Sequence, residues 1–154
     1  MFETIHTITE WWDGPRSGIA NYQGIPHFFE SLWRDVNGRG EDVFLLSPVD
    51  AETFQLALEA WGIWQRWETA FYQKQANLDT HPALPEDRSR HEELKQLLDV
   101  KLVIDAAHAV QKRARFRECQ NQPWNGVGLM PLEIQWTEVS EVNEAMLSEE
   151  HRTD

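Results

Sequence analysis

The run from Phe54 to Tyr72, FQLALEAWGIWQRWETAFY, constrains the fold more than any other stretch of the chain. On a helical wheel its polar residues share one narrow stripe, and apolar residues take most of the remaining circumference. That arc is wider than the apolar stripe of about 100° on an ordinary surface helix, so the pattern predicts a helix covered on two or three sides. Asp50 precedes the run, and its carboxylate is expected to cap the helix.

Glu68 departs from this pattern, because its direction on the wheel lies inside the apolar arc, between Trp61 and Trp64. In one interpretation the carboxylate reaches the edge of the core and pairs with an arginine or an indole N–H. In the other, the carboxyl group has a raised pKa in an apolar site and acts as a general acid or base. The first is favoured, since one carboxylate without a partner makes no mechanism.

Segments rich in β-branched and aromatic residues predict strands on both sides of this helix. They span residues 2–12, 18–22, 25–33 and 43–46 before it, and residues 112–119 and 132–137 after it. Pro85, followed by Glu86 and Asp87, indicates the start of a second helix that continues to Leu102.

The predicted fold class is therefore α+β. An antiparallel β-meander of about four N-terminal strands, with a C-terminal strand pair, is expected to pack against two main helices. Residues 1–137 are expected to form a single globular domain, and residues 138–154 an acidic tail or short helix.

The charge of the chain narrows the classes of partner. Its 154 residues include 26 acidic and 14 basic ones, for a net charge of −12. This balance disfavours nucleic acid and suits a basic protein or a cation. Cys119, the single cysteine, excludes an internal disulfide and favours a cytoplasmic location. We expect neither a membrane span nor a signal peptide, since the chain has no run of about 18 apolar residues and no basic-then-apolar amino terminus.

His81, Asp87 and His91 are the candidate metal ligands. Asp87 and His91 are four residues apart and would share a helix face, and His81 could fold back towards them. Such a group could bind a divalent metal or serve as a base with its orienting partner. In the favoured alternative, Asp87 stabilises the helix start, His91 is exposed and His81 holds a turn. No cofactor is therefore predicted, with a divalent metal as the alternative.

Trp11, Trp12, Asp13 and Arg16 form a second candidate binding site, at a tight turn. Charged and aromatic residues on a rigid turn can make a recognition site. They can equally make an ordinary hairpin end closed by an ion pair.

Arg113, Arg115 and Arg117 would form a basic stripe on the first C-terminal strand. It could bind an anion or the acidic tail, but cross-strand pairing with Glu133 is favoured. The same cations could lower the pKa of the Cys119 thiol.

Three stretches, WWDGPRSGIANYQG, FQLALEAWGIWQRWETAF and THPALPEDRSRHEEL, resemble a group of small bacterial proteins of uncharacterised function. The resemblance runs from about residue 7 to residue 137. It implies a bacterial cytoplasmic protein and transfers no site residue.

The leading functional hypothesis is a non-enzymatic protein-binding or regulatory module. No nucleotide-binding, hydrolase or zinc motif is present in the sequence, and the acidic, tryptophan-rich composition suits a basic protein partner. The alternative is a small metal-binding protein or hydrolase-type enzyme that uses His81, Asp87 and His91. A third is a structural subunit that forms a homodimer.

Overall fold

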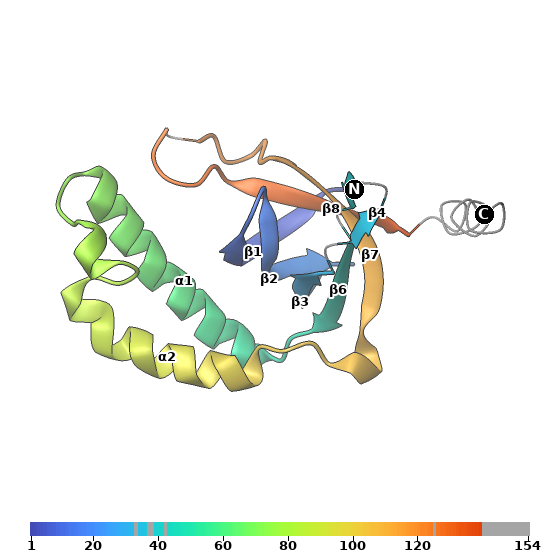
Figure 1. Ribbon diagram of the computed structural model, residues 1–154, viewed down its shortest axis with the longest axis horizontal. Helices are drawn as coiled ribbons and strands as arrows, with labels where there is room; N and C mark the ends of the chain where they lie inside the picture. The colour runs from blue at the N-terminus through green and yellow to red at the C-terminus, as the bar shows by residue number, and fades with distance from the viewer. Residues whose placement is uncertain (33, 37–38, 42, 125, 140–154) are drawn as a thin grey trace.

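Six antiparallel strands close into a barrel, and a helical hairpin lies beside it (Figure 1). The computed structural model describes residues 1–139 apart from residues 33, 37–38, 42 and 125. In order around the barrel, the strands are β1 (Glu3–Trp11), β2 (Pro15–Tyr22), β3 (Ile25–Ser31), β6 (Val43–Pro48), β7 (Val110–Glu118) and β8 (Leu132–Glu138). Two short strands, β4 (Arg34–Val36) and β5 (Arg39–Glu41), pair as a separate ribbon.

The helical hairpin consists of α1 (Ala51–Tyr72) and α2 (Arg88–Lys101). Three short 3₁₀ turns accompany it, at Leu78–Thr80, Pro85–Asp87 and Ala106–His108. Neither helix in the described part of the chain combines the length and apolarity that crossing a bilayer requires.

The predicted open meander packed against the helices is wrong, because the sheet closes on itself. Glu3 pairs with Ile134 and Thr4 with Glu133, which joins the first strand to the last. Inward side chains from the six strands then fill the barrel without a covering helix layer. The buried members of this core are Ala20, Phe29, Phe44, Leu46, Ala114 and Ile134.

Irregular pairing between β1 and β2 helps the barrel to curve. Their register shifts at three places along β1, and such bulges bend and twist a strand. Gly18 lies in this region, opposite Ile8, and a Cβ added there would lie 2.1 Å from the carbonyl oxygen of Thr7. A side chain is therefore excluded where the two backbones approach closely.

The predicted central helix is confirmed as α1, and so is its cap. Asp50 Oδ1 accepts a hydrogen bond of 2.8 Å from the Thr53 amide. An apolar cluster of Ile63, Ala83 and Leu94 joins α1 to α2. Gly62 lies within α1, and the nearest atom to a Cβ added there is in the side chain of Arg66, at 3.6 Å.

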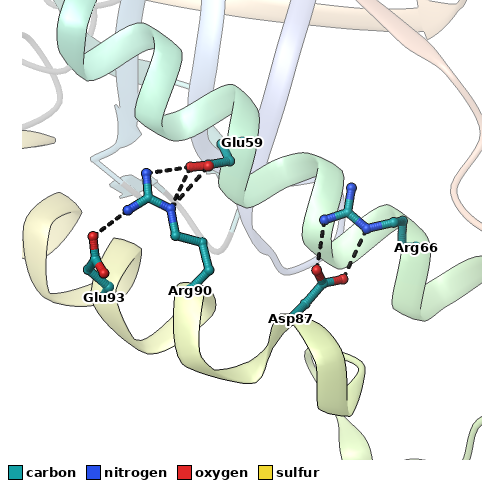
Figure 2. Close-up of polar contacts among 5 residues, drawn as sticks. All are labelled: Glu59, Arg66, Asp87, Arg90 and Glu93. Carbon is teal, nitrogen blue, oxygen red and sulfur yellow. Dashed lines mark hydrogen bonds and ion pairs between the residues drawn. The ribbon is translucent and has the colours of Figure 1, made fainter.

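Ion pairs border this helix–helix contact (Figure 2). Arg66 Nε and Nη2 each donate a 3.0 Å hydrogen bond to the Asp87 carboxylate. Arg90 binds Glu59 at 2.7 Å, and it also pairs with Glu93 on its own helix. Apart from Asp87, which is 17% exposed, these side chains are 40–61% exposed, so the apolar cluster is expected to provide most of the stability.

The C-terminal strand pair is confirmed as β7 and β8. Arg117 lies opposite Glu133 and donates to its carboxylate, as the cross-strand interpretation of the arginine stripe requires. Residues 37–38, between β4 and β5, lie outside the described residues. So does most of the predicted acidic tail, from residue 140 onwards.

Candidate functional sites

A cleft of about 380 Å³ lies between β1, α1 and the connection from β7 to β8. Figure 1 shows this connection extending beyond the barrel on the side of α1. Clefts of about 300–1,000 Å³ are typical of small-molecule sites. The lining includes residues with aromatic, amide, carboxylate and thiol side chains: His6, Trp61, Trp64, Gln65, Glu68, Cys119, Asn121, Gln122 and Glu133.

Trp61 and Trp64 form an aromatic wall of this cleft. They lie one helical turn apart on α1, and their rings stack with centroids 4.9 Å apart and planes inclined by 22°. Both also line a second, smaller cleft between α1, α2 and β1. The two indoles thus separate the two clefts, which accounts for their partial exposure despite the apolar arc on which they lie.

Glu68 lies in the first cleft, one turn beyond Trp64. Within the described residues, its only hydrogen bond comes from the Leu129 amide, 3.3 Å from Oε1, and no cation pairs with it. The arginine or indole partner expected from the sequence is therefore replaced by a backbone amide. Burial raises the pKa of the Glu68 carboxyl, and the Leu129 amide opposes that shift in part.

Gly128 brings the backbone of the connection against this carboxylate. Its φ of +72° lies in the left-handed region that favours glycine. A Cβ at this position would lie 2.1 Å from Glu68 Oε1 and 2.7 Å from the carboxyl carbon. Glycine therefore satisfies two requirements, the backbone turn and the close approach to Glu68.

Cys119 also lines the cleft, but its thiol is not activated. Burial raises the pKa of the Cys119 thiol, the nearby Glu133 carboxylate raises it further, and Arg117 opposes both effects. The predicted lowering of this pKa by the arginine stripe is wrong. Since the thiolate is the nucleophile, the environment disfavours covalent chemistry at Cys119.

The predicted recognition turn forms the tip of the β1–β2 hairpin. The side chains of Trp11 and Trp12 are 49% and 71% exposed, whereas Arg16 is buried. The Arg16 guanidinium donates to the carbonyl oxygens of Trp12 and Asp13, the latter at 2.7 Å. Positive φ angles at Asp13 and Gly14 complete the turn. Arg16 thus holds the backbone that presents two exposed indoles.

The predicted metal ligands have other partners. His81 packs edge-on against Trp67, with ring centroids 4.6 Å apart. Asp87 accepts both hydrogen bonds from Arg66, and His91 borders the smaller cleft. Among the described residues, no three or more histidine, cysteine or acidic side chains form a group that could hold a metal ion.

Sequence reasoning found part of the main cleft and missed the rest. The position of Glu68 inside an apolar arc was the visible signal. No signal in the sequence marks Gly128 and Leu129, because their role depends on a contact with a residue about 60 positions earlier in the chain. No local pattern reports such a contact.

Comparisons of this chain with protein-family models, with curated proteins and with solved structures find no match. The resemblance to a group of small bacterial proteins stays a prediction.

Proposed function

We propose that this protein is a non-enzymatic binding module that engages a basic protein through the tip of its β1–β2 hairpin. The main observation behind this proposal is that Trp11 and Trp12 are exposed on a turn whose carbonyl oxygens accept hydrogen bonds from Arg16. Tryptophan is enriched among the residues that dominate interface energies. A turn held in place before binding reduces the entropy lost on association.

Charge supports a basic partner. Glu10 and Asp13 are exposed on either side of the tryptophan pair, and the whole chain carries a net charge of −12. Such a field accelerates association with a positively charged surface and disfavours nucleic acid. The proposal includes a cytoplasmic location, which the single cysteine favours.

The test compares the double variant Trp11→Ala/Trp12→Ala with a matched control, Trp124→Ala. Trp124 is 41% exposed but lies on the β7–β8 connection. Each purified protein is immobilised and used to capture proteins from a bacterial lysate. Captured basic proteins are then purified and titrated by calorimetry. We expect at least one captured basic protein to bind the wild type and the control with equal affinity. The same protein is expected to bind the double variant at least about 30-fold more weakly, since interface hot spots contribute roughly 2 kcal/mol or more.

Two outcomes would contradict the proposal. In one, all three proteins retain the same partners with equal affinity. In the other, sedimentation shows a wild-type homodimer that the double variant loses, which would assign the hairpin tip to self-association. Both substitutions replace exposed side chains, so circular dichroism is expected to show unchanged folding.

A further inference from the structure

We propose that the cleft between α1 and the β7–β8 connection binds a small organic amine with an apolar body, and that Glu68 binds its ammonium group. This inference is independent of the hairpin tip, which lies outside the cleft lining. It depends on the charge, the shape and the hydrogen-bonding groups of the cleft.

The charge of the lining is negative. Its described residues include the carboxylates of Glu68 and Glu133 and contain no lysine or arginine. Glu133 is paired with Arg117, which leaves Glu68 as the carboxylate without a cation in the described part of the chain. A carboxylate in a partly buried site is stabilised by an opposite charge, and a bound ammonium would supply one.

The hydrogen-bonding and charged groups of the cleft suit an amine better than a metal ion. Zinc takes four protein or water ligands and calcium six to eight oxygens, whereas the described residues provide no group of three acidic, histidine or cysteine side chains for a metal. An ammonium group needs only hydrogen-bond acceptors for its N–H donors. Glu68 provides one, and Gln65 and Gln122, whose side chains each carry an acceptor oxygen, belong to the same lining.

The aromatic wall fits the rest of such a ligand. Trp61 and Trp64 offer apolar surface for its body, and tryptophan is the best partner for a cation held near a ring. A ligand with both a cationic end and an apolar body would use both features of the cleft. A purely apolar molecule would leave Glu68 without a cationic partner.

Two amines, phenethylamine and tryptamine, are the probes. Phenethyl alcohol and phenylpropionate serve as neutral and anionic counterparts of similar size. Binding to the full-length protein at pH 8 is measured by saturation-transfer NMR and by calorimetry. We expect both amines to bind, and the alcohol and the carboxylate to bind at least about tenfold more weakly, because only the amines form a charge-assisted hydrogen bond with Glu68.

Two pairs of variants locate the binding. Glu68→Gln removes the charge with little change of shape, and its control, Glu52→Gln, alters an exposed carboxylate in the first turn of α1. Gly128→Ala displaces the Glu68 carboxylate. Its control is Gly126→Ala. Gly126 also has a positive φ, of 83°, but no atom lies within 4 Å of a Cβ added there. We expect about tenfold weaker amine binding for the first member of each pair and an unchanged affinity for each control.

Three results would overturn the proposal: neither amine binds the wild type, the alcohol binds as tightly as the amines, or Glu68→Gln keeps full affinity. If Glu68→Gln fails to fold, the two glycine variants still test the proposal. Equal amine affinities of Gly128→Ala and Gly126→Ala would exclude Glu68 as the ammonium partner. The Trp11→Ala/Trp12→Ala protein is expected to bind the amines normally, so failure of either proposal leaves the other intact.

Discussion

At the scale of single residues, Glu68 shows how a local anomaly in a sequence can mark a site. A carboxylate within an apolar arc is visible in the sequence, but its partner is not. The structure supplies a backbone amide and a glycine from the β7–β8 connection, about 60 residues later in the chain. The resulting group is partly buried, has a raised pKa and faces a cleft.

This raised pKa predicts a specific pH dependence of stability. The folded state binds the Glu68 proton more tightly than the unfolded state does, so the ionised group destabilises the fold above its folded pKa. That destabilisation disappears as the pH falls below the unfolded pKa. Glu68→Gln is therefore expected to be more stable than the wild type at pH 7.5, by an amount that shrinks towards pH 4.

Urea denaturation at several pH values measures this difference. The other titratable groups lining the cleft, His6, Cys119 and Glu133, are present in both proteins, so their contributions largely cancel. A constant difference between the two proteins across this range would show that burial does not shift the Glu68 equilibrium.

At the scale of elements, the helical hairpin separates apolar from ionic stabilisation. Leu94 is fully buried between α1 and α2, whereas the ion pairs in Figure 2 lie at the border of that contact. Leu94→Ala is expected to lower the free energy of unfolding by about 3 kcal/mol through loss of burial and creation of a cavity. Asp87→Asn, which weakens the pair with Arg66, is expected to cost less than about 1 kcal/mol.

Chemical denaturation at low and high salt tests this ranking. Salt is expected to reduce the loss of unfolding free energy in Asp87→Asn and to leave the loss in Leu94→Ala unchanged. The reason is that salt screens the ion pair between Asp87 and Arg66 but not the apolar contacts of Leu94. Equal effects of the two substitutions would refute the ranking.

The elements themselves were the most predictable part of the molecule. Periodicity and capping residues predicted α1 within three residues of its observed start, and alternation predicted the two C-terminal strands. The short strands β4 and β5 were missed, because three-residue segments carry too little pattern to stand out from a loop.

At the scale of the whole molecule, closure of the barrel was the main feature that sequence reasoning missed. Alternation identifies which residues of a strand face inward, but an open sheet and a closed one share that alternation. Closure depends on how far the sheet bends, and in this protein the irregular β1–β2 pairing around Gly18 contributes to the bend.

Gly18→Ala should therefore destabilise the entire barrel. The added methyl group would meet the Thr7 carbonyl at 2.1 Å and force two paired backbones apart. We expect a loss of about 3 kcal/mol or more in the free energy of unfolding. The control Gly24→Ala has a positive φ but open space around its added Cβ, and should cost only about 1 kcal/mol. Thermal denaturation of both variants measures the contrast, and similar melting temperatures would show that the close approach is dispensable.

The β1–β8 seam also has a consequence for synthesis of the protein. On the ribosome, β1 emerges long before β8, the partner that completes its second edge. Until residues 133 and 134 have been translated, Glu3 and Thr4 of β1 cannot pair with Ile134 and Glu133 of β8. Folding of the nascent barrel can therefore finish only late in translation. Until then β1 is an edge strand that chaperones would need to shield.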